Sequence, residues 1–89
     1  MEIKITTNQG ESTVSENIYI AYNVVNEKNK LQNINGVIHK NAKMAGFVSY
    51  DNTRSGLQFS LYNEHGLNIT EQKATFETFV SDVEQLITD

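Results

Sequence analysis

Three successive runs of alternating side chains constrain the fold of this chain more than any other feature. They span residues 31–40, 44–51 and 56–63, and short polar connections join them. Alternation with a period of two is typical of strands that bury one face, and connections this short fit β-hairpins. Consecutive hairpins make an antiparallel meander, so the sequence predicts one sheet whose strands follow each other in chain order.

The run at residues 17–25, NIYIAYNVV, allows two interpretations. Its apolar residues fit strand alternation, and together with Val14 they also fit a helical stripe. β-Branched and aromatic residues favour the strand, because their side chains lose rotamer freedom against a helical turn. We expect a strand here, with a helix over residues 14–26 as the alternative. Residues 2–7, EIKITT, predict a short first strand, and several strands of the sheet could be its pairing partner. The polar segment 8–15 is expected to be a loop.

The segment from Ile69 to Asp89 predicts an amphipathic helix, because its apolar residues recur at helical spacing. Asn68 precedes this segment, and Glu71 follows three residues later in the pattern of a capping box. Large buried apolar side chains each contribute roughly 1.5–3 kcal/mol to folding, so Phe76 and Phe79 are predicted to be the most damaging positions to change.

The predicted fold class is α+β. It is an antiparallel β-meander of four to five strands with one C-terminal amphipathic helix packed on one face, and residues 1–89 form a single small domain. A slip of one residue would turn polar groups into the apolar face, so matching the apolar faces predicts the register. The predicted opposite pairs are Tyr50 with Leu57, Ile38 with Gly46, and Tyr22 with Ile34.

The sheet face opposite to the predicted helix is too apolar for a plain solvated surface. We expect it to present a partner-binding patch made of Tyr19, Val37, Phe47 and Tyr62. The partner is another protein or a second copy of the chain, which makes a homodimer seam one of the alternatives. In the structural alternative, residues 2–15 fold over part of this face.

The charge is unevenly distributed along the chain. Residues 1–70 carry six acidic and six basic side chains, so the net charge of −4 arises entirely in the C-terminal segment. That acidic helix is expected to suit a basic partner surface. The alternative function is weak nucleic-acid binding through the basic loop residues Lys28, Lys30 and Arg54, although a sequence pI near 5.0 argues against it.

The sequence offers little for catalysis or metal binding. It has no cysteine, which excludes disulfides and thiolate metal sites, and it carries none of the familiar nucleophile, phosphate-loop or zinc-protease motifs. His39, His65 and Glu64 come near one end of the predicted sheet, but their spacing is not that of a metal site. We therefore expect no enzyme, no cofactor and no metal.

The expected function is that of a small acidic, non-catalytic protein-interaction module, an adaptor, regulator or inhibitor acting by protein–protein contact. No run of apolar residues approaches the roughly 18 needed for a membrane span, so a cytoplasmic location is expected. Heavy use of asparagine and isoleucine is typical of an AT-rich genome and fits a phage or mobile-element protein.

Overall fold

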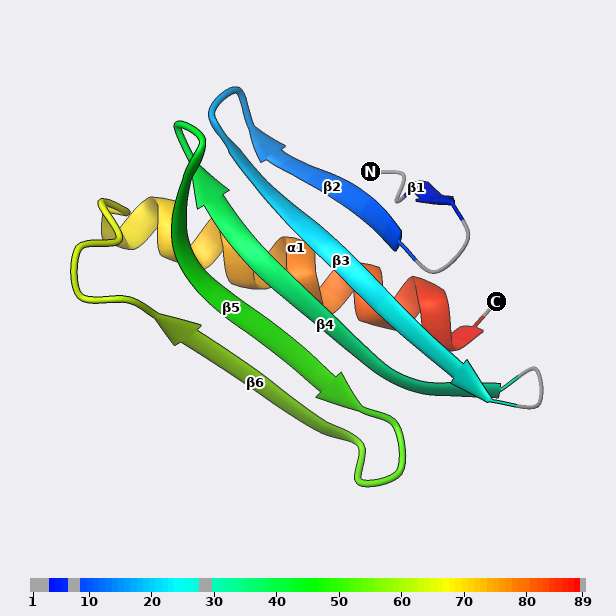
Figure 1. Ribbon diagram of the computed structural model, residues 1–89. Coiled ribbons are helices and arrows are strands. Elements are labelled where there is room, and N and C mark those ends of the chain that lie inside the picture. The colour runs from blue at the N-terminus through cyan, green and yellow to red at the C-terminus, as the bar shows by residue number, and fades with distance from the viewer. Residues whose placement is uncertain (1–3, 7–8, 28–29, 89) are drawn as a thin grey trace.

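The computed structural model describes residues 4–6, 9–27 and 30–88. One antiparallel sheet of six strands carries one long helix on one of its faces (Figure 1), which confirms the predicted α+β meander and adds a strand to the expected four to five. The strands lie in chain order from one edge of the sheet to the other. The elements are β1 (Lys4–Thr6), β2 (Gln9–Ser15), β3 (Ile18–Glu27), β4 (Lys30–Lys40), β5 (Lys43–Asp51), β6 (Gly56–Leu61) and α1 (Ile69–Thr88).

The N-terminal third of the chain differs from the prediction in one respect. The segment expected to be a loop is strand β2, which pairs with both β1 and β3 and so extends the sheet instead of covering a face. In its sequence, QGESTVS, the fully buried residue is Ser12, and the one apolar side chain that packs against the core, Val14, is only partly buried. A buried serine gives no hydrophobic signal, which explains the wrong prediction. The strand predicted over residues 17–25 is confirmed as β3.

The predicted register is correct for two hairpins and wrong for one. Ile38 lies opposite Gly46 and Tyr50 lies opposite Leu57, as expected. Tyr22, however, lies opposite Gly36 instead of Ile34, a shift of two residues that leaves Tyr22 on its predicted face. A β-carbon at Gly36 would come within 2.8–3.0 Å of Val48, Ile20 and Tyr22, so the glycine makes room for these side chains.

The core lies between the sheet and α1. Phe79 is fully buried, as predicted, whereas Phe76 is 41% exposed and meets Phe59 edge-on with ring centroids 5.2 Å apart. The prediction that Phe76 is a core residue is therefore wrong, because it lies on the flank of the helix. The core consists of Ile18, Ile20, Tyr22, Val24, Ile34, Ile38, Ala45, Val48, Tyr50, Leu67, Phe79 and Val83.

Polar contacts join α1 to the sheet in both its N-terminal and its C-terminal half. At its start Asn68 and Glu71 exchange the two hydrogen bonds of the predicted capping box, 2.8 and 3.0 Å long. The Lys40 ammonium at the end of β4 donates to Glu71 and to the carbonyl of Gly66. Farther along, the buried Tyr22 hydroxyl donates to the buried Asp82 carboxylate at 2.7 Å.

Candidate functional site

The face of the sheet turned away from α1 is the candidate site, and we call it the open face (Figure 1). The register aligns one polar side chain from each of five neighbouring strands across it. All five are uncharged, and four end in a primary amide. This amide row, from β2 to β6, is Gln9, Asn23, Asn35, Ser49 and Gln58. Four strand spacings make it about 19 Å long.

A second row lies beside the first. Ala21, Val37 and Phe47 lie opposite one another on β3, β4 and β5, and we call them the apolar row. Glu11 and Ser60 continue this row toward the two edges of the sheet. The open face therefore presents hydrogen-bonding groups and apolar groups in two parallel lines, each crossing the strands.

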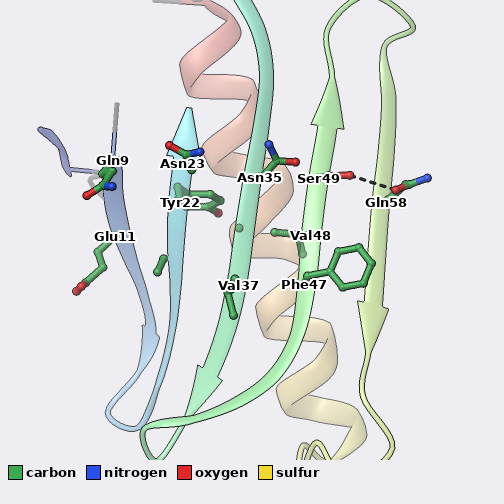
Figure 2. Close-up of a pocket in the computed structure, with 13 residues that line it drawn as sticks. Gln9, Glu11, Tyr22, Asn23, Asn35, Val37, Phe47, Val48, Ser49 and Gln58 are labelled. Atoms are coloured by element: carbon green, nitrogen blue, oxygen red, sulfur yellow. Dashed lines mark hydrogen bonds between the residues drawn. The ribbon is translucent and has the colours of Figure 1, made fainter. Parts of the chain in front are cut away.

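The two rows line an open hollow of about 820 Å³ on the surface of the sheet. Figure 2 shows the labelled amides at one level, with Glu11, Val37 and Phe47 at the next. The small side chain of Ala21 contributes to the floor of the hollow, and the Phe47 ring at its side is 40% exposed. This volume lies within the roughly 300–1,000 Å³ that is typical of small-molecule sites.

Much of the hydrogen-bonding capacity of the amide row is unused. Asn35 donates to Asn33, and Ser49 donates to the carbonyl oxygen of Gln58. These bonds leave the Asn35 oxygen free to accept and the Gln58 amide nitrogen free to donate. The amide of Asn23 has no hydrogen-bond partner among the described residues. The row thus offers donors and acceptors together, without charge.

The charged groups near the hollow are few. Glu11 is the one carboxylate in its lining, and no basic side chain is among the described residues that line it. A second hollow of about 420 Å³ shares Asn35, Ser49 and Gln58 and extends toward Asp51 and Arg54. Bonds from Thr53 hold the pKa of Asp51 below its ordinary value, and the Arg54 guanidinium adds to this effect.

The structure places all four predicted patch residues on the open face but does not bring them into one cluster. Val37 and Phe47 are neighbours in the apolar row, and the Tyr62 ring lies 6.4 Å from that of Phe47. Tyr19 stacks on His39 at 4.7 Å, outside the lining of the hollow. The two-residue register shift explains this position, because it replaces Tyr19 by Ala21 in the apolar row.

The residues of the nucleic-acid alternative are only partly described. Lys28 and the side chain of Lys30 lie outside the described residues. Arg54 is exposed in the β5–β6 turn, 3.8 Å from the Asp51 carboxylate. An exposed pair of this kind contributes little to stability, so the guanidinium is available to solvent.

The two histidines weighed above as metal ligands lie in different environments. His39 stacks on Tyr19 in the sheet, while the ring nitrogen of His65 accepts a bond from the Leu67 amide in the loop before α1. Within residues 4–6, 9–27 and 30–88, no three His, Cys, Asp or Glu side chains come close enough to hold a metal ion.

The acidic helix is less available to a partner than its sequence predicts. Asp82 is buried against Tyr22, and Glu71 is engaged by Asn68 and Lys40, contacts that lower the Glu71 pKa in that order of importance. Glu77 and Glu84 are exposed on the described helix and their carboxylates form no ion pair with the described residues, and Lys73 is exposed beside them.

Three polar members of the site were missed from the sequence. Gln9 and Glu11 belong to the segment expected to be a loop, and Asn23 was placed outside the polar row by the wrong register. The signal that could have found Gln9 and Glu11 is the polar alternation of β2 itself.

No protein family model matches the chain, and neither the search of curated proteins nor that of solved structures found a match. In the described part of the chain, no helix is both long and apolar enough to cross a membrane.

Proposed function

We propose that this protein is a non-catalytic interaction module that binds a segment of another protein in the hollow of the open face. The observation that carries the proposal is the uncharged amide row beside the apolar row, across a hollow of about 820 Å³. The chemistry of this surface fits a polypeptide better than a charged ligand.

The amide row complements a peptide main chain. A main chain offers a donor and an acceptor at each residue without net charge, and a side-chain amide offers the same two groups in one plane. Asn23, Asn35 and Gln58 carry unused donors or acceptors that a bound segment would satisfy. Such bonds hold a segment in place with little dependence on its sequence.

The apolar row supplies affinity and selects for an apolar side chain. About 40% of the Phe47 side chain is exposed, which is on the order of 80 Å² for an aromatic residue. Covering that area contributes about 2 kcal/mol at 25 cal/mol per Å². Tyr62, which is 41% exposed beside Phe47, enlarges the contact. Aromatic anchors of this kind often dominate the energy of an interface.

The lining charge disfavours the nucleic-acid alternative. Phosphate groups require basic side chains, and the lining of the larger hollow provides a carboxylate, Glu11, instead. Glu11 suits a segment that carries a lysine or arginine near its apolar side chain.

A random peptide library displayed on phage and selected on the purified protein tests the proposal. Selected peptides are expected to bind the wild type and to lose at least tenfold in affinity against Phe47→Glu. Phe76→Glu is the matched control, because Phe76 has the same exposure, 41% against 40%, on the opposite side of the sheet. Asn35→Ala is expected to weaken binding less than Phe47→Glu.

Three results would count against the proposal. The library could yield no peptide that binds, the peptides could bind Phe47→Glu as well as the wild type, or Phe76→Glu could be the damaging change. Salt-dependent binding of oligonucleotides that Arg54→Glu abolishes would instead support the nucleic-acid alternative.

A further inference from the structure

The two edges of the sheet differ in how they are protected. An edge strand presents unpaired main-chain groups, and proteins usually block it by shortening it, charging it, bulging it or placing proline in it. β1 is a three-residue strand that includes Lys4. β6 has six residues, GLQFSL, without a charge or a proline, and its pairing with β5 is regular along its whole length. In Figure 1, β6 forms a free border of the sheet.

The sequence of β6 complements itself. The segment from Leu57 to Leu61, LQFSL, shows the same apolar and polar order in both directions about Phe59. Paired antiparallel with a second copy, it sets Phe59 opposite the partner's Phe59 and leucine opposite leucine. Gln58 then lies opposite Ser60 of the partner subunit. A pair of this type already forms inside the sheet, where Ser49 donates to Gln58 at 3.2 Å.

Apolar surface lies next to this edge on the helix side. Leu57 is 42% exposed, and it lines a groove of about 250 Å³ together with Ile87, which is 48% exposed. Phe76, 41% exposed, lies against Phe59. An isolated exposed side chain is normal, but these residues gather along the one unprotected edge of the described sheet.

We propose that a second copy of this chain pairs with β6 edge to edge, forming a two-fold symmetric dimer with one continuous sheet of twelve strands, two sets of six. The two-fold axis of antiparallel pairing between identical strands stands perpendicular to the sheet. Both helices therefore lie on one face, and the two open faces lie side by side on the other. In such a sheet, residues that lie directly opposite each other on the two copies of β6 must point to the same face. The register centred on Phe59 meets this condition, and a register shifted by one residue does not.

The available area predicts a weak dimer. The longest and shortest extents of the molecule, 38 and 18 Å, have a product of about 680 Å², which is an upper limit for an interface along the six-residue β6. Stable interfaces bury about 800 Å² on each partner. The dimer is therefore expected to dissociate on dilution. Its contact residues other than Gln58 lie outside the lining of the larger hollow, so its failure would leave the peptide-binding proposal standing.

Analytical ultracentrifugation over a wide range of concentrations tests this inference. The wild-type mass is expected to rise from the monomer value of 10.1 kDa toward twice that value as concentration increases. The double change Gln58→Lys with Ser60→Lys sets like charges directly opposite each other and should raise the dimer Kd at least tenfold. Both positions are exposed, so the fold should survive the change.

A charge-reversed variant makes the test specific. Gln58→Glu with Ser60→Glu should not self-associate, but mixed with the lysine-substituted variant it should restore a dimer. Thr13→Lys with Ser15→Lys on β2 adds the same charge away from β6 and should associate like the wild type. The inference is overturned if the wild type stays at 10.1 kDa at every concentration, or if the Gln58 and Ser60 changes leave association unaltered.

Discussion

Replacing Tyr22 with phenylalanine removes one hydroxyl from the interface between β3 and α1. That hydroxyl donates to an oxygen of Asp82 at 2.7 Å, and the two residues are 3% and 2% exposed. The phenylalanine ring can keep the packing of the tyrosine ring, whose centroid lies 6.4 Å from that of Phe79. The substitution therefore isolates one buried hydrogen bond.

The expected loss is large for a domain of this size. A hydrogen bond to a charged group contributes about 1.5–3 kcal/mol to stability. Its removal also leaves the Asp82 carboxylate buried without this partner, which lowers stability further. We expect Tyr22→Phe to lower the free energy of unfolding by about 2–3 kcal/mol. At roughly 4–8 °C per kcal/mol, the Tm should fall by about 10–20 °C. The whole domain has only about 4–13 kcal/mol of stability at this length.

Urea unfolding followed by circular dichroism at pH 7 measures this loss. Asp82→Leu and the double variant complete a cycle in which the two changes should couple by at least about 1.5 kcal/mol. If Tyr22→Phe stays within about 0.5 kcal/mol of the wild type with the same urea dependence, the bond does not hold α1 on β3 and the reasoning is refuted.

The same bond predicts an alkaline dependence of stability. Burial, followed by the hydrogen bond and charge of Asp82, raises the pKa of Tyr22 above its ordinary value of 10.0. The folded protein then keeps the phenolic proton that the unfolded chain releases, so stability falls as pH rises past about 10. Tyr22→Phe should lose less stability than the wild type between pH 9 and pH 11, measured by the urea midpoint.

Four further substitutions test separate parts of the fold by urea unfolding. Phe79→Ala should cost about 3–5 kcal/mol because Phe79 is fully buried, and Phe76→Ala clearly less; equal costs would contradict the assignment of Phe76 to the helix flank. The contacts of Glu71 lower its pKa below the ordinary value of 4.5, so they stabilise the fold at pH values above 4.5 and lose this effect as the pH falls. Glu71→Gln should therefore lose less stability than the wild type between pH 5 and pH 3. Ala42 has a φ of 64° in the β4–β5 turn, so Ala42→Gly should stabilise by about 0.5–1 kcal/mol, and a destabilised variant would refute that explanation.

The elements that could be predicted are those whose apolar residues mark one face. Alternation along β5 and β6 fixed their register, because a slip of one residue would have turned Val48 or Phe59 outward. A shift of two residues carries no such penalty, so the pairing of Tyr22 could not be chosen correctly from faces alone. β2 was missed because its buried residue is a serine, and Phe76 was misplaced because helical spacing does not distinguish the centre of an apolar face from its flank.

The site was predictable only in part, and most clearly in its apolar row. Val37 and Phe47 are conspicuous on an otherwise polar face, and the sequence alone placed them together. Asparagine, by contrast, is common in turns, so Asn23 and Asn35 carry no signal of their own. They become an amide row with Gln9 and Gln58 only when the registers of four successive strand pairs are all correct, and the pairings of β2 with β3 and of β3 with β4 were not predicted correctly.

The most direct test of the open-face account is a titration of a phage-selected peptide into the ¹⁵N-labelled protein, followed by NMR. We expect the largest amide shifts at the residues of the hollow, above all Asn35, Val37, Phe47 and Ser49, with saturation that Phe47→Glu abolishes. Shifts confined to α1 or to the β6 edge, or saturation unchanged in Phe47→Glu, would contradict the assignment of the open face as the binding surface.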